Sequence, residues 1–409
     1  MLAAVRIRAT AAIRAAATDV KATRAGAGAE VESQITHAPG QSFDGTVSTG
    51  KVDTLTGIRG LAALWVAWFH FSTYPDIGTI DLGPIVACGY WGVDVFFVLS
   101  GLVLAINYAP RFASGDFDWR AFRAFLGKRI ARIYPLHLVT FLLVFVFWKI
   151  AMHTGQNFPL QENNNRWTEL CNVLLIHAWG LARTSFNAPS WSVSAEWFAY
   201  LFVFPLCVAG LRRRSVPYCL AVVGIVWFTF LAYIFRYHAG SLEFVATDGI
   251  LRIIPEFIAG YALYRLAPLQ RPGGGNGALL VGLAAITALA YLPAVTVVLL
   301  LPAIMLLMVG LYSGGSLVEA IFANRVAVFL GEISYSIYMV HIIVAAVVNH
   351  LVRLAGIAPT VAHAVIVLIA ETLLTLGLSF VVYRCIEVPG RALVGAKLGL
   401  VEPATVVAQ

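Results

Sequence analysis

Charged residues are scarce in this chain. They make up 12% of its 409 residues, whereas hydrophobic residues make up 60%. Soluble globular domains are about 25% charged, and the mean hydropathy of this sequence is +0.82. This composition excludes an ordinary soluble domain and predicts a polytopic membrane protein.

Cysteine is also infrequent, with five residues that lie mostly in apolar segments. Their spacing matches neither paired metal ligands nor the disulfide framework of a small secreted protein. We therefore expect packing roles for the cysteines and no metal site. The formal net charge is +7, but basic loops that orient a membrane protein account for it without nucleic-acid binding.

The beginning of the chain lacks aromatic residues until Phe43 and is rich in alanine, threonine and glycine. Such a composition is typical of disorder, and scattered acidic residues disfavour the alternative of a transit peptide. The expected organisation is a disordered cytoplasmic tail at residues 1–50, a transmembrane domain at 51–392 and a short cytoplasmic tail at 393–409.

Apolar runs recur from residue 55 onward, each near the ~20 residues that a helix needs to cross the hydrocarbon core. Their number predicts an all-α bundle of about ten transmembrane helices. A shorter run at 170–182 is interpreted as re-entrant. The ten runs are 55–72, 85–108, 135–152, 191–211, 217–235, 249–266, 278–292, 295–312, 328–350 and 361–385.

Arginine and lysine favour one side of this arrangement. With a cytoplasmic N-terminus, the basic stretch before residue 135, the RRRS segment at 212–215 and Lys397 all fall inside. The polar segment around Asn164, which is poor in lysine, falls outside. This distribution obeys the positive-inside rule. It predicts a multi-pass protein of the cell's inner (plasma) membrane with both termini in the cytoplasm.

The first apolar run, GIRGLAALWVAWFH, contains two ionisable residues, Arg59 and His70. On a helix they would lie within ~20° of one face and ~16 Å apart along the axis, and a face carrying both could line one channel. The alternatives are that Arg59 snorkels to the interface and that His70 makes an interhelical hydrogen bond.

Two carboxylates lie in later runs. Asp94 is inside the second run, where an unpaired charge is costly, so we expect a basic partner such as His70 or an arginine. Ser192 and Glu196 are four residues apart in SWSVSAEW and share a helical face. Glu196 is a second candidate partner for His70.

The segment GEISYSIYMVH places Ser334, Tyr338 and His341 on one side of the ninth run. This stripe is either part of a polar site or a set of hydrogen bonds between helices.

A basic loop precedes the third run and contains Lys128, Arg129 and Arg132 in LGKRIARIYP. Orientation in the membrane explains these residues adequately. Clustered arginines also suit phosphate recognition through their forked donors, and coenzyme A carries a pyrophosphate and a 3′-phosphate. Both interpretations stay open.

These segments together resemble the membrane-bound acyltransferase 3 family, whose members O-acylate glycans and other hydroxyl-bearing compounds. Arg59 followed at the eleventh residue by His70 is similar to the signature of the family's first span. Further blocks resemble the family in the expected order from about Thr54 to Arg391. They are GVDVFFVLSG, KRIARIYP, SWSVSAEW, RIIPEFIAG, GEISYSIYMVH and EVPGR.

The resemblance implies a ten-span transferase that takes an acyl group, typically acetyl, from cytoplasmic acyl-CoA and has no permanently bound cofactor. It implies that His70 is the central catalytic residue. Asp94 and Glu196, which the residues alone suggest as its partners, are further catalytic candidates. Arg59, Arg129 and Arg132 would contact the acyl-CoA or hold the site, and Lys128 of the basic loop is a further candidate for binding it. The acceptor would be a glycan or another hydroxyl compound. The lipid bilayer would surround the protein.

Neutral imidazole is a base poised near physiological pH, so His70 could deprotonate the acceptor hydroxyl. A covalent acyl-imidazole relay is a second route. The rival class of function is a transporter or flippase that uses Arg59, His70, Asp94 and Glu196 as a substrate or proton path. Such transporters often contain paired repeats, which are not evident in this sequence.

Overall fold

The computed structural model describes residues 49–73, 81–110, 112, 118–155, 163–183, 186–240, 242, 248–266, 273–357 and 360–400. Helices account for nearly all of the described residues, and no strand occurs among them. The all-α prediction is confirmed for this part of the chain. The expected N-terminal tail lies outside the described residues, apart from Thr49 and Gly50, which begin the first described helix.

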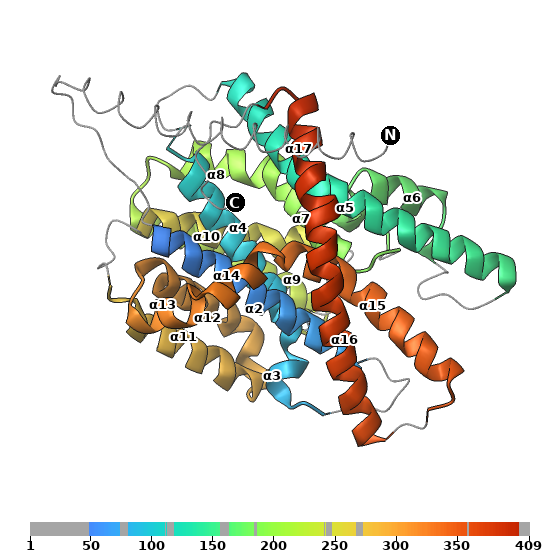
Figure 1. Ribbon diagram of the computed structural model, residues 1–409. Coiled ribbons are helices and arrows are strands. Elements are labelled where there is room, and N and C mark those ends of the chain that lie inside the picture. Colours follow the sequence, from blue (N-terminus) through green and yellow to red (C-terminus); the bar gives the residue numbers. More distant parts are fainter. Residues whose placement is uncertain are drawn as a thin grey trace, which may run out of the picture. The chain divides into compact units, whose positions relative to one another are not determined.

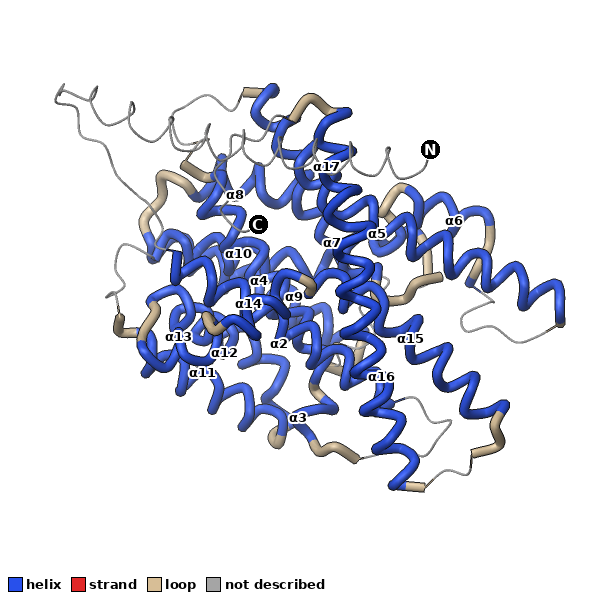
Figure 2. Tube along the Cα trace, in the orientation of Figure 1, coloured by secondary structure: helices blue, strands red, loops and turns tan. Residues whose placement is uncertain are grey.

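The described helices differ widely in length, from the four residues of α3 to the 36 residues of α5 (Figures 1 and 2). In the first half they are α2 (Thr49–Thr73), α3 (Pro84–Ala87), α4 (Gly92–Tyr108), α5 (Trp119–Thr154), α6 (Arg166–Val173), α7 (Ser190–Phe198), α8 (Phe204–Leu211) and α9 (Val216–Tyr237). In the second half they are α10 (Gly249–Leu266), α11 (Gly275–Ala290), α12 (Pro293–Ser313), α13 (Ser316–Phe322), α14 (Arg325–Glu332), α15 (Ser334–Leu354), α16 (Val361–Val382) and α17 (Val388–Lys397).

Short turns of other helical types join some of these helices. A 3₁₀ turn, Gly89–Trp91, leads into α4. Two π-helical turns, Ala199–Val203 and Tyr383–Glu387, join α7 to α8 and α16 to α17. The expected boundary after residue 392 falls inside α17.

All ten apolar runs lie on helices, but fewer than ten of these helices have the length and composition of a membrane span. Among the described residues, six helices or joined helices are long and apolar enough to cross a membrane, and a bent pair, Val297–Ser313 with Ser316–Phe322, raises the number to seven. Helix α11 has 16 residues, and α2 and α10 contain charged residues. A helical membrane bundle is therefore supported, whereas the count of ten stays a prediction.

The run interpreted as re-entrant, 170–182, does not form one helix. It contains the end of α6, a turn and the short π-helical segment His177–Leu181, in which Gly180 has a φ of +75°. The segment lies between α5 and α7 in the chain and contacts α7 and α10.

Helix α2 lies at the centre of the described bundle and packs against α4, α12, α13, α14, α15 and α16 (Figure 1). Close approach of helices depends on small residues here. A Cβ atom on Gly101 of α4 would overlap the backbone of Phe257 on α10, and one on Gly260 of α10 would overlap the backbone of Val98 on α4. Small residues at helix crossings are a common way to pack helices in membranes.

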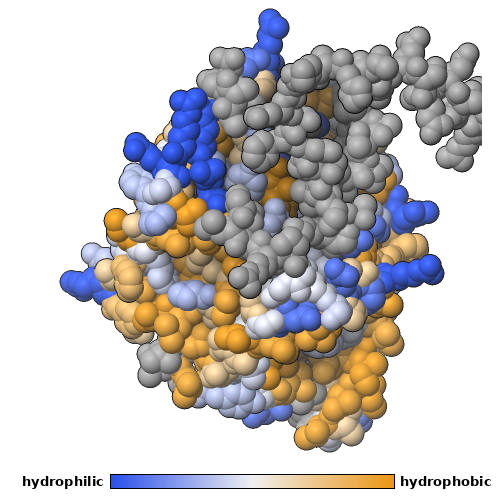
Figure 3. Space-filling model, turned by 90° about the vertical axis from the view of Figure 1, so that its left-hand side faces the viewer, coloured by the Kyte–Doolittle hydropathy of each residue, from blue (hydrophilic) through white to orange (hydrophobic). Residues whose placement is uncertain are grey.

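The outer surface of the bundle carries many large apolar side chains. Ile225 and Phe228 on α9 are more than 60% exposed, as is Leu373 on α16. In the face shown in Figure 3, hydrophobic residues cover much of the surface, and strongly hydrophilic ones gather at the upper edge and the two sides. Lipid contact explains this distribution without a soluble partner.

Candidate active site

Helix α2 carries both Arg59 and His70 without interruption. Gly57 and Gly60 flank the arginine, and a Cβ atom on either would overlap α13 or α14. The glycines therefore let α2 lie directly against these helices, which turns the Arg59 side of α2 toward α4 and α5. Arg59 and His70 line two different cavities along this helix.

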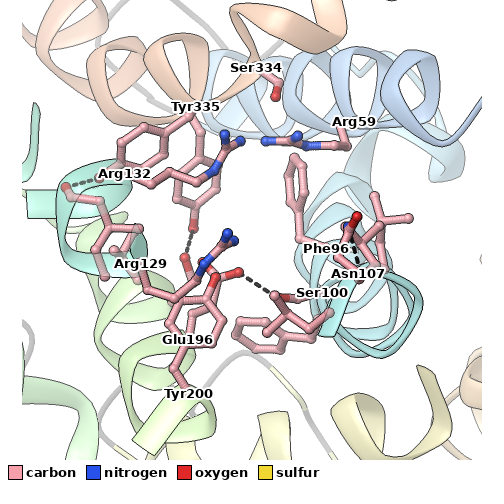
Figure 4. A pocket seen from close by; sticks show the side chains of 18 residues that line it. Arg59, Phe96, Ser100, Asn107, Arg129, Arg132, Glu196, Tyr200, Ser334 and Tyr335 are labelled. Carbon is pink, nitrogen blue, oxygen red and sulfur yellow. Dashed lines mark hydrogen bonds between the residues drawn. The ribbon is translucent and has the colours of Figure 1, made fainter. Parts of the chain in front are cut away.

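The first cavity, called here the arginine cavity, has a volume of about 110 Å³ and is lined by Arg59 from α2 and by Arg129 and Arg132 from α5. Figure 4 shows the three guanidinium groups directed toward the same space. Because Arg129 and Arg132 are three residues apart, they lie on one face of α5, as the sequence predicts. Such a cluster attracts an anionic group strongly.

Arg129 is held by aromatic side chains. Its side chain donates from Nη2 to the hydroxyl of Tyr108 at 3.0 Å. Its guanidinium carbon lies 5.4 Å from the centre of the Tyr108 ring and 5.9 Å from the rings of Phe125 and Tyr200. Cation–π contacts of this kind stabilise a guanidinium away from water, so Arg129 keeps one orientation in the cavity.

Glu196 brings a negative charge into the arginine cavity. It accepts a hydrogen bond from Ser100 Oγ at 2.6 Å. Ser192, one turn earlier on α7, lines the same cavity, as the spacing of the two residues predicts. Glu196 does not line the cavity that contains His70. The structure thus brings Glu196 to the arginines rather than to the cavity of His70.

The second cavity, called here the histidine cavity, has a volume of about 260 Å³ and is lined by His70, Tyr90, Trp191 and Arg252, among others. The Nδ1 atom of His70 lies 2.9 Å from the carbonyl oxygen of Val66, one turn earlier on α2. The walls combine aromatic and aliphatic side chains, with Arg252 as the charged group. A cavity of this kind could hold an organic acceptor beside the imidazole.

Tyr338 on α15 lines both the arginine cavity and the histidine cavity. Its hydroxyl accepts a hydrogen bond from Ser192 Oγ at 2.8 Å, and its ring packs edge-on against Phe96. The two cavities therefore adjoin at one tyrosine whose position is fixed from α4 and α7.

Asp94 is paired with Arg252 of α10. The Nε atom of Arg252 donates to Asp94 Oδ1 at 3.0 Å, and Nη2 donates to Oδ2. Glu256 Oε1 lies 3.8 Å from Arg252 Nε, and all three side chains are at most 3% exposed. Of the two kinds of partner expected for Asp94, the structure shows an arginine. This ion pair joins α4 to α10.

A third cavity, called here the basic vestibule, has a volume of about 540 Å³ and lies between α5 and α17. Lys128, Arg132 and Arg391 line it, and Arg132 also lines the arginine cavity. Arg391 Nη2 donates to Glu387 Oε1 at 3.1 Å, and Glu387 Oε2 accepts from Ser336 Oγ at 2.9 Å. Glu387 thus fixes Arg391 relative to α15.

A serine and a histidine also meet outside these cavities. Ser190 Oγ lies 3.1 Å from His177 Nε2. The two residues are 0% and 2% exposed, and burial lowers the pKa of His177 to about 3, with a smaller effect from His137. Because neither Ser190 nor His177 lines the cavities described above, this pair is best explained as a link between α7 and the segment before it.

The expected donor-site residues Arg59, Arg129 and Arg132 meet in one cavity, and Lys128 lies in the adjoining vestibule. Residue patterns did not identify Arg252, Glu256 or Arg391, nor the contact between His341 Nε2 and His70 Nδ1, which are 3.2 Å apart. Arg252 and Glu256 lie in RIIPEFIAG and Arg391 lies in EVPGR. Ionisable residues in apolar segments were the signal that could have identified these three.

Comparisons with known proteins identify a family for this chain. Residues 52–384 match the family model described as "Acyltransferase domain". Acyltransferase MdmB of Streptomyces mycarofaciens is 30% identical over 324 residues, which cover 72% of this chain and 79% of that protein. A protein of Acidianus two-tailed virus named as a putative acetyltransferase is 26% identical over 74% of this chain and 86% of its own length.

A shorter match is Protein 2 in picA locus of Rhizobium radiobacter, 33% identical over 26% of this chain and 51% of that protein. No solved structure matches this chain.

Proposed function

Because the chain belongs to the acyltransferase family that its residues 52–384 match, and is therefore an acyl-transferring enzyme, we propose that it moves an acyl group from cytoplasmic acyl-CoA to a hydroxyl group. Acetyl is the acyl group we expect, and a glycan or another surface or secreted compound is the acceptor. The protein would work in the inner membrane with both termini in the cytoplasm.

The observation that carries the proposal is the succession of the three cavities. The basic vestibule and the arginine cavity share Arg132, and the arginine cavity and the histidine cavity share Tyr338. Coenzyme A has a phosphorylated nucleotide at one end and a thioester at the other. The cations suit its phosphates, and a thioester that reached Tyr338 would lie next to the cavity of His70.

His70 is the proposed general base. As the acceptor oxygen attacks the thioester carbonyl, its O–H proton passes to a ring nitrogen of His70 and the new C–O bond forms. The C–S bond then breaks, and the thiolate of coenzyme A takes the proton from the imidazolium. The acyl group has then moved from sulfur to oxygen, and His70 is neutral again.

Tyr338 is the proposed donor to the oxyanion of this reaction. A phenol hydroxyl can accept one hydrogen bond and donate another. When Ser192 donates its single proton to Tyr338 rather than to the carbonyl oxygen of Pro189, which is 3.2 Å away, the proton of Tyr338 is available to an oxygen in the adjoining cavity. Donors positioned for a developing oxyanion are usually a large part of catalysis in acyl transfer.

Two alternatives differ in what they require. An acyl-imidazole relay would use His70 as a nucleophile, and trapping of an acylated protein after rapid mixing with labelled acetyl-CoA would favour it. A transporter would need no acyl donor, and the family and the relatives, named as acyltransferases or acetyltransferases, give no support to that function.

The donor site is tested with purified protein in lipid nanodiscs, by measuring the release of coenzyme A from acetyl-CoA in the presence of a panel of glycans and small hydroxyl compounds. Arg132→Gln should raise the KM for acetyl-CoA at least about tenfold, because a charge-assisted hydrogen bond contributes about 1.5 to 3 kcal/mol. The matched control is Arg120→Gln, an exposed arginine on the same helix. An equal KM in both variants would overturn the assignment.

The base is tested with His70→Gln, which keeps hydrogen-bonding capacity without a usable proton acceptor. Loss of a positioned general base costs about 10² to 10⁴ in rate, so transfer should nearly disappear while the protein still inserts. His350→Gln, at an exposed position of α15, should keep full activity. A His70→Gln enzyme with more than about a tenth of wild-type kcat would refute the role of His70.

A further inference from the structure

A buried histidine, His341, and a half-buried one, His70, meet at the wall of the histidine cavity. His341 of α15 is 0% exposed, and its Nε2 atom lies 3.2 Å from Nδ1 of His70. The ring centres are 5.0 Å apart and the planes are tilted by 53°. This is hydrogen-bond geometry, which needs one nitrogen with a proton and one without.

A backbone carbonyl decides which nitrogen of His341 carries the proton. Its Nδ1 atom lies 2.7 Å from the carbonyl oxygen of Tyr338. A carbonyl oxygen only accepts hydrogen bonds, so Nδ1 of His341 must be the donor. A neutral imidazole has one N–H group, and Nε2 of His341 is consequently an acceptor that faces His70.

The same reasoning fixes His70. Its Nδ1 atom faces two acceptors, the carbonyl oxygen of Val66 at 2.9 Å and Nε2 of His341 at 3.2 Å. Nδ1 of His70 therefore carries the proton. The basic lone pair of the neutral ring is then on Nε2, the nitrogen on the opposite side of the ring.

We propose that His341 is a positioning residue for the acyl transfer, acting through His70. It holds His70 in the tautomer whose Nε2 is the base, and its own Nε2 accepts the Nδ1–H bond of the imidazolium that forms when His70 takes the acceptor's proton. This inference rests on the proposed function and assigns the orienting role to a second histidine.

In many enzymes a carboxylate orients the catalytic histidine, and two carboxylates in this chain were considered for that role. Asp94 is bonded to Arg252, and Glu196 accepts from Ser100. Neither lines the histidine cavity. Besides the carbonyl oxygen of Val66, the neutral ring of His341 presents an acceptor atom to the Nδ1–H of His70, and it is the side-chain acceptor there.

Three substitutions separate this role from simple packing. His341→Gln can place its side-chain oxygen near the position of Nε2 and so keep an acceptor for His70. His341→Asn keeps a group near Nδ1 but is too short to reach His70, and His341→Leu keeps the volume without an acceptor. Each enzyme is assayed in nanodiscs with acetyl-CoA, after size-exclusion chromatography has shown that the protein is folded.

The leucine and asparagine variants should lose about ten- to a hundredfold in kcat, the effect of one hydrogen bond to a charged group, with an unchanged KM for acetyl-CoA. The glutamine variant should recover most of this loss. A kcat for His341→Leu near that of wild type, or no recovery with glutamine, would overturn the proposal. If the leucine variant does not fold, the comparison of glutamine with asparagine decides.

A second measurement does not depend on activity. Nitrogen-15 NMR of histidine-labelled wild-type protein, with the His70 signal assigned by its loss in His70→Gln, should show the proton on Nδ1. A proton on Nε2 would overturn the tautomer and with it the role of His341. An active His70→Gln enzyme would instead refute the proposed function. An inactive His70→Gln enzyme beside a fully active His341→Leu enzyme would refute only this inference.

Discussion

Replacement of Asp94 by asparagine should destabilise the protein by about 3 to 5 kcal/mol, because it leaves a buried guanidinium without its main partner. Asp94 accepts two hydrogen bonds from Arg252, one of them at 3.0 Å from Nε. Each such bond to a charged group contributes about 1.5 to 3 kcal/mol. An asparagine presents an NH₂ group to one of the two donors, so at least one bond is lost outright.

The neighbouring Glu256 provides the matched control. Its carboxylate is 1% exposed and 3.8 Å from Arg252 Nε, and neither of its oxygens makes a hydrogen bond with the described residues. Glu256→Gln keeps the size of the side chain and removes no hydrogen bond to Arg252, which lies 3.8 Å away. We expect a change below about 1 kcal/mol.

The assay is reversible unfolding in mixed micelles of mild detergent and dodecyl sulfate, followed by tryptophan fluorescence. Asp94→Asn combined with Arg252→Met removes both charges and should recover most of the lost stability, as neutral replacements of buried ion pairs often do. A larger loss of stability for Glu256→Gln than for Asp94→Asn would show that the pairing of Arg252 described here is incorrect.

Further predictions concern the donor site, the helix packing and the topology. Arg391→Gln, which alters the basic vestibule but not the histidine cavity, should raise the KM for acetyl-CoA and leave kcat within about twofold, since it removes binding that the ground state and the transition state share. Gly101→Val should lower the unfolding free energy by at least about 1 to 3 kcal/mol, the usual cost of overpacking, because its side chain would overlap α10; equal stability in the same unfolding assay would contradict that contact. Reporter fusions after Ser215 and Lys397 should report the cytoplasm and a fusion at Asn164 the opposite face, and a common side for Ser215 and Asn164 would require a different arrangement of the spans.

The positions of the helices could be predicted from the sequence because an apolar run of spanning length is typical of a membrane helix. The number of membrane spans was harder to predict. Helix α10 contains charged residues and α11 is short, so neither has the length and composition of a helix that crosses a membrane by itself. Hydropathy does not report where a neighbouring helix covers a polar side chain.

Part of the candidate site could also be predicted from residue spacing. Spacing on one helix predicts that Arg129 and Arg132 share a face, and they do line one cavity. Contacts between distant helices leave no spacing signal. The partner of Asp94 is 158 residues away in the chain, and the partner of His70 is 271 residues away. Ionisable residues in apolar segments show that partners are needed, but not which ones.

The charge of the arginine cavity has a consequence for the membrane itself. A protein that passes a chemical group between the two faces of a bilayer must not also leak ions. The arginine cavity shares Arg132 with the basic vestibule and Tyr338 with the histidine cavity, so it lies between them. Its three guanidinium groups repel cations, as an arginine does in water channels that exclude protons. If the acyl group crosses the bilayer as proposed, this positively charged section would favour its anionic carrier over protons and sodium ions.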